Sequence, residues 1–66
     1  MTRLADLEFR VEVWDDRDLH VVEIVAASGN LLVARAAYDE ALKHRPGVIL
    51  RLRHRARVIR EFLPER

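Results

Sequence analysis

The sequence predicts a small α+β domain of two layers, with the order strand, strand, helix, strand. Apolar and polar residues alternate over residues 7–14 and again from residue 48, as they do in half-buried strands. Between these segments, apolar residues recur at intervals of three and four over residues 31–44, as they do in an amphipathic helix. A chain of 66 residues without cysteine is expected to be a single domain, residues 1–66, held together by packing alone.

The first two strands are expected to form a hairpin over residues 7–28. In the segment LEFRVEVW, one face carries Leu7, Phe9, Val11 and Val13, and the other carries Glu8, Arg10, Glu12 and Trp14. The segment DDRD follows, and its aspartates favour a turn before the second strand, LHVVEIVAAS. These aspartates lack the glycine pivot and the closing glutamate of a calcium-binding loop, so we expect no metal there.

A helix is expected at residues 31–44. Asn30 suits the N-cap position, and Pro46 with Gly47 ends the helix. The apolar side is rich in alanine and consists of Leu31, Ala34, Ala37, Tyr38, Ala41 and Leu42. Such small side chains allow the helix to lie close to a sheet.

Residues 48–60 are expected to form one long third strand, and residues 63–66 a frayed tail. One face of this strand would carry Ile49, Arg51, Arg53, Arg55, Arg57 and Ile59. We refer to its four arginines as the arginine ladder. Placed beside the free edge of the first strand, the third strand completes a three-stranded mixed sheet of order 2-1-3, with the helix on one face and the other face open.

Charge is distributed unevenly along the chain. Residues 1–44 hold five basic and nine acidic residues, a net charge of −4, whereas residues 45–66 hold seven basic and two acidic residues, a net charge of +5. Such asymmetry is typical of surfaces that bind nucleic acid or an acidic protein. The contact residues would be the arginine ladder and Arg60, with Trp14 as a stacking platform. Glu8 and Glu12 lie on the neighbouring strand, however, and are expected to pair with two or three of these arginines.

The leading interpretation is a non-catalytic interaction or accessory protein that acts as a homodimer. A third strand of this length overhangs the first two and leaves apolar side chains to be buried. Either a bulge near His54 folds the strand back, or the strand pairs with another chain. On the open sheet face and the C-terminal strand, the expected dimer contacts are Val21, Val25, Val58, Ile59, Phe62 and Leu63.

The sequence offers little for catalysis, so we expect neither enzymatic activity nor a cofactor. There is one serine, one threonine and no cysteine, and the three histidines are not spaced as metal ligands. The remaining enzymatic hypothesis is an intersubunit site built on Glu12, Glu23 and His54. No segment approaches the roughly 20 apolar residues that span a bilayer, and the N-terminus does not resemble a signal peptide, so we expect a cytoplasmic protein without membrane contact.

Overall fold

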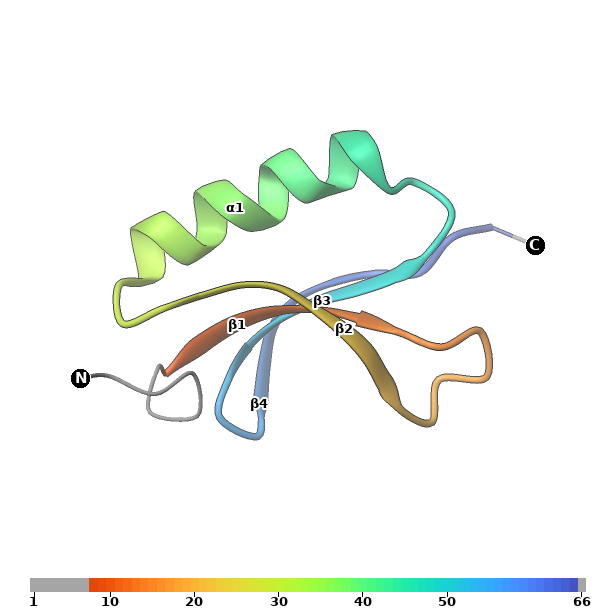
Figure 1. Ribbon diagram of the computed structural model, residues 1–66, viewed down its shortest axis with the longest axis horizontal. Helices are drawn as coiled ribbons and strands as arrows, with labels where there is room; N and C mark the ends of the chain where they lie inside the picture. The colour runs from red at the N-terminus through yellow and green to blue at the C-terminus, as the bar shows by residue number, and fades with distance from the viewer. Residues whose placement is uncertain (1–7, 66) are drawn as a thin grey trace.

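Four strands and one helix form two layers in the computed structural model, which describes residues 8–65 (Figure 1). The elements follow in the order β1 (Phe9–Trp14), β2 (Val21–Ser28), α1 (Leu31–His44), β3 (Ile49–His54) and β4 (Arg57–Phe62). The strands lie side by side in the order β2-β1-β3-β4, and α1 covers one face of the sheet (Figure 1). The predicted α+β class, with one helix on an open sheet, is confirmed. Leu7 of the predicted hairpin and Arg66 of the predicted tail lie outside the described residues.

The predicted order 2-1-3 holds for the first three strands, but the sheet has four strands and not three, because residues 48–60 do not form one long strand. The chain turns at Arg55 and Ala56, where Arg55 adopts a left-handed backbone conformation with a φ of 58°. β4 then runs back antiparallel to β3, so the three pairings among the described strands are all antiparallel. This turn packs Ile59 and Phe62 against the core, which removes the apolar overhang of a single long strand.

The core lies between α1 and the centre of the sheet. Its buried members are Val11, Val13, Ala34, Tyr38, Ala41, Leu50 and Leu52. The alanines of α1 let the helix approach the strands, and Tyr38 fills the remaining space as the one large buried side chain of the helix. Full burial of a valine or leucine side chain contributes about 1.5–3 kcal/mol, so this layer supplies most of the apolar stabilisation.

Hydrogen bonds fix both ends of α1. Asn30 is the N-cap, and its Oδ1 accepts a hydrogen bond from the N–H of Val33 at 3.1 Å. At the other end, the N–H of Arg45 donates to the carbonyl oxygen of Ala41 at 2.9 Å. The guanidinium of Arg45 also bonds both carboxylate oxygens of Glu23 in β2, with Nη2 donating at 3.2 Å. The C-terminal end of α1 is therefore tied to the sheet.

Two bulges in β2 change which of its side chains face α1. The pairing with β1 steps past Val22 and Val25, so strict alternation is lost. Glu23 lies opposite Val13 and therefore on the helix side, where it meets Arg45. Strict alternation would have placed Glu23 on the open face, by which we mean the side of the sheet away from α1.

The run DDRD forms the turn between β1 and β2. The Oδ1 of Asp15 accepts hydrogen bonds from the backbone N–H groups of Leu19 at 2.7 Å and His20 at 3.1 Å. These bonds favour the ionised carboxylate and lower the pKa of Asp15. Asp18 adopts a φ of 61°, which aspartate tolerates better than most residues. The turn thereby directs Asp18 toward β3.

Candidate interaction surfaces

A buried carboxylate lies at the centre of the open face. Glu12, on β1, has only 1% of its side chain exposed. Its Oε2 lies 3.4 Å from the Nε of Arg10 and accepts a hydrogen bond from Nη2 of Arg53 at 3.2 Å, while its Oε1 accepts one from Nε1 of Trp14 at 3.2 Å. The Nε of Arg53 is also 2.7 Å from Oε1, at an angle unsuited to a hydrogen bond. Two guanidinium groups thus offset a carboxylate that has lost nearly all of its water.

Arg51 is a second centre of charge on the open face, and only 9% of it is exposed. Its guanidinium bonds both carboxylate oxygens of Asp18, with Nη2 donating at 3.0 Å, and its Nε donates to Oε1 of Glu61 at 2.7 Å. The hydrogen bonds to Asp18 are the main reason that the pKa of Arg51 is raised, and the same bonds lower the pKa of Asp18. One side chain therefore joins the β1–β2 turn, β3 and β4.

The indole ring of Trp14 lies against both arginines. The Cζ atoms of Arg51 and Arg53 are 4.8 Å and 5.5 Å from the ring centroid, within the range of cation–π attraction. These internal contacts compete with the stacking of a nucleic-acid base, the role predicted for Trp14 from the sequence.

The arginine ladder is not formed. Arg51 and Arg53 lie on the open face, but the turn that follows β3 removes the later members from it. Arg55 lies in the turn itself, and Arg57 pairs in β4 with His54, on the helix side of the sheet. The alternation of the sequence continues through the turn and does not mark it, but the turn agrees with the alternative in which the strand folds back near His54.

Three of the five arginines predicted to contact nucleic acid are neutralised within the chain. Besides the two on β3, this group includes Arg55, whose Nη2 donates to Oε1 of Glu8 at 3.3 Å. The expectation that carboxylates on the first strand pair with some of these arginines is confirmed. The remaining two, Arg57 and Arg60, are exposed, and neither forms an ion pair with any residue of the range 8–65.

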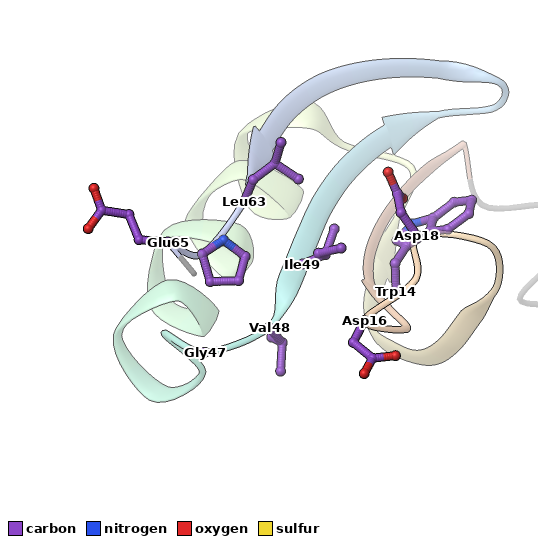
Figure 2. A pocket seen from close by; sticks show the side chains of 9 residues that line it. Trp14, Asp16, Asp18, Gly47, Val48, Ile49, Leu63 and Glu65 are labelled. Atoms are coloured by element: carbon purple, nitrogen blue, oxygen red, sulfur yellow. The ribbon is translucent and has the colours of Figure 1, made fainter.

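A pocket of about 670 Å³ lies beside Trp14, between the β1–β2 turn, the start of β3 and the segment after β4 (Figure 2). Its lining residues are Trp14, Asp16, Asp18, Gly47, Val48, Ile49, Leu63, Pro64 and Glu65. Leu63 and Pro64, which belong to the predicted frayed tail, thus line this pocket. Its lining combines apolar side chains with three carboxylates, those of Asp16, Asp18 and Glu65.

The residues of the enzymatic hypothesis are not brought together within the chain. Glu12 lies on the open face, whereas Glu23 and His54 lie on the helix side. The His54 ring stacks on Phe9 with 4.6 Å between centroids, and its Nε2 lies 3.2 Å from Oε2 of Glu8. Among residues 8–65, no group of three or more histidine, aspartate or glutamate side chains is arranged to hold a metal ion.

β2 forms one edge of the sheet and is exposed along its first five residues. It pairs with β1 on its inner side, and no described strand lies on its outer side. Four of the five exposed residues are apolar, with exposed fractions of 37% to 60%: Val21, Val22, Ile24 and Val25. Leu31, Leu32 and Val33, in the first turn of α1 beyond the other end of β2, are exposed as well.

The residues predicted to form a dimer contact do not share one surface. Those that are exposed are Val21, Val25, Val58 and Leu63. Ile59 and Phe62 pack against the core instead. The sequence interpretation did not include Val22 and Ile24, although the run VVEIV, with one charge in five residues, is the signal that identifies them.

The described part of the chain contains no helix with the length and hydrophobicity needed to cross a membrane. Comparison of the protein with family models, with curated proteins and with solved structures finds no match.

Proposed function

We propose that the protein is a non-catalytic interaction domain whose β2 edge binds an extended segment of a protein partner as an additional strand. The observation that carries this proposal is the exposed and apolar edge strand itself. An edge strand presents unpaired backbone N–H and C=O groups, which a second extended segment can satisfy. The exposed valines and isoleucine of β2 then supply the apolar contact.

The opposite edge of the sheet differs in the property that matters for strand addition. β4 has three charged residues among its six, namely Arg57, Arg60 and Glu61. β2 has one among its eight, Glu23, and this carboxylate is bonded to Arg45 of the same chain. Charged side chains on an edge discourage pairing with other chains. β4 is protected in this way, and β2 is not.

Nucleic-acid binding, the alternative that the sequence suggests, has weaker support. A phosphate backbone is held by several cations that are not already paired. The chain uses Arg51, Arg53 and Arg55 in its own ion pairs, which leaves on β4 two arginines that form no ion pair with residues 8–65. Exchange of the C-terminal strand between copies also loses support, because β4 pairs with β3 of its own chain.

Site-specific photocrosslinking tests the proposal in cells that express the full chain. A photoreactive phenylalanine analogue replaces Val22 on the β2 edge, and the matched control carries it in place of Arg57 on the β4 edge. We expect protein adducts from position 22 and few from position 57. The opposite pattern, or adducts with nucleic acid from position 57 alone, would contradict strand addition at β2.

A further inference from the structure

We infer that the partner of β2 is β2 of a second copy, paired antiparallel across a two-fold axis that is perpendicular to the sheet. This inference rests on the proposed function, because it names the segment that fills the same edge. The pairing joins two four-stranded sheets into one continuous sheet of eight strands. Both helices then lie on the same side of the joint sheet, because a perpendicular axis does not exchange its faces.

Pairing of β2 with itself produces a closed assembly of two copies. An open apolar edge pairs with other copies until no such edge is left. A contact between β2 and the β4 edge of the next copy would place valines beside Arg57 and Arg60 and would leave new open edges at both ends. Pairing of β2 with itself uses one surface twice and leaves only the charged β4 edges exposed, so it ends at two copies.

The β2 edge carries little charge that would oppose pairing with a second copy. Two identical strands that pair with each other bring like charges close together, which normally opposes self-association. In β2 the single charged residue is Glu23, and its carboxylate already accepts two hydrogen bonds from Arg45. The two copies therefore present a largely neutral edge to each other.

Exposed leucines flank β2 at both of its ends. Leu19, which precedes the strand, is 60% exposed, and Leu32, in the first turn of α1 after it, is 75% exposed. Antiparallel self-pairing sets the beginning of each β2 beside the end of the other. The exposed apolar residues that flank the strand are thereby brought to the same end of the interface, in two equivalent places.

The bulges at Val22 and Val25 determine how much backbone hydrogen bonding and how much side-chain burial stabilise such an interface. They shorten the regular backbone ladder that a second strand can add, since a bulge leaves its extra residue out of register. The bulges also break the alternation of side chains along β2. In a regular strand every second side chain would face the core, whereas in β2 Val21, Val22 and Val25 are all exposed. Side-chain burial accordingly contributes to this dimer together with backbone hydrogen bonds.

Sedimentation velocity over a range of protein concentrations tests the inference. We expect the wild-type chain to be dimeric at micromolar concentration, and Val22→Lys to weaken the dimer by at least about tenfold, which corresponds to 1.4 kcal/mol. The matched control is Val58→Lys, because Val58 is 45% exposed on the β4 edge. This control should leave the dimer unchanged, and far-UV circular dichroism verifies that both variants fold.

A second measurement uses the absence of native cysteine. Single-cysteine variants, Val22→Cys on β2 and Val58→Cys on β4, are spin-labelled, and dipolar spectroscopy then measures the distance between labels. A short distance from position 22 and a long one from position 58 are expected for two β2 strands paired about one axis. A dimer with the reverse pattern would overturn the inference.

The outcomes separate this inference from the proposed function. A wild-type chain that stays monomeric at high micromolar concentration, yet crosslinks to other proteins from position 22, overturns the second copy as partner and keeps strand addition. A monomer without such crosslinks overturns both. A dimer that is disrupted by Val58→Lys and not by Val22→Lys would contradict both strand addition at β2 and the pairing of β2 with a second copy.

Discussion

The carboxylate of Asp18 accepts hydrogen bonds from two nitrogens of the Arg51 guanidinium, including one from Nη2 at 3.0 Å. The two residues are 33 positions apart and belong to the β1–β2 turn and to β3. Glu61 accepts a further hydrogen bond from Nε of Arg51 at 2.7 Å. This guanidinium therefore holds a turn against the sheet, in addition to pairing two strands.

The Asp18–Arg51 pair predicts a specific loss of stability in acid. Hydrogen bonding to Arg51 lowers the pKa of Asp18 below 3.8 in the folded protein. The stabilisation that ionised Asp18 contributes is therefore fully present above the pKa that Asp18 has in the unfolded chain. It is lost as the pH falls through the lower pKa that Asp18 has in the folded protein. In urea unfolding measured over a series of acidic pH values, Asp18→Asn should reduce the dependence of the unfolding free energy on pH.

The control for this prediction is the same substitution in an Arg51→Gln background. Without the guanidinium, Asp18→Asn should no longer alter the dependence of unfolding free energy on pH. An equal effect in both backgrounds would mean that another group is responsible for the shift.

Glu12→Gln is expected to destabilise the fold by about 3 kcal/mol, because a buried ion pair that loses one charge leaves the other uncompensated. Here the substitution leaves Arg10 and Arg53 without their shared carboxylate. The midpoint of urea unfolding at neutral pH measures the effect. Glu40→Gln serves as control, since the Glu40 side chain is 62% exposed on α1, and this variant should keep the wild-type midpoint.

Arg55→Gly is expected to stabilise the protein by roughly 1 kcal/mol, since a left-handed backbone costs about 1–2 kcal/mol for residues with a Cβ. The loss of the exposed contact with Glu8 offsets little of this gain. Ala56→Gly is the control in the same turn. Ala56 is not among the described residues with positive φ, so glycine there should destabilise by about 0.5–1 kcal/mol. Equal effects of the two glycines in chemical denaturation would contradict the assigned turn.

Tyr38 is expected to limit stability in alkali. Burial against the sheet raises the pKa of its hydroxyl above 10.0. The unfolded chain then releases this proton first, so stability is unaffected below a pH of about 10 and falls as the pH rises beyond it. The rise of tyrosinate absorbance with pH measures the shift directly, because the chain has one tyrosine. Tyr38→Phe should be less sensitive to alkali than the wild type, and equal sensitivity would contradict the prediction.

Local signals in the sequence were sufficient for much of the fold. Asn30 and Pro46 delimit the helix, and alternation identifies β1 and its core face. A fold-back near His54 was one of two alternatives for the third strand, but the β3–β4 turn could not be assigned from the sequence because Arg55 and Ala56 are neither glycine, asparagine nor proline. Tertiary packing of Ile59 and Phe62 decides the turn instead of local propensity.

The surfaces were predictable to a smaller degree. Placing β1 beside β3 was enough to expect that Glu12 pairs with an arginine of the strand, and Arg53 does so. The Asp18–Arg51 pair depends on the geometry of a turn, and the position of Glu23 depends on bulges in β2. Bulges have no marker in a run of valines, so the exposed edge could not be assigned by counting alternate residues.

The central position of β1 has a consequence for synthesis. β1 leaves the ribosome before the other described strands, yet one of its two partners, β3, is made only after β2 and α1. Phe9 cannot meet His54 until most of the chain has been translated. The β3–β4 hairpin, whose contacts are local, can form on its own and then dock onto the β1–β2 pair. We therefore expect folding to end with a docking step, and nascent chains stalled before β3 to expose both β1 and β2 to neighbours on the same message.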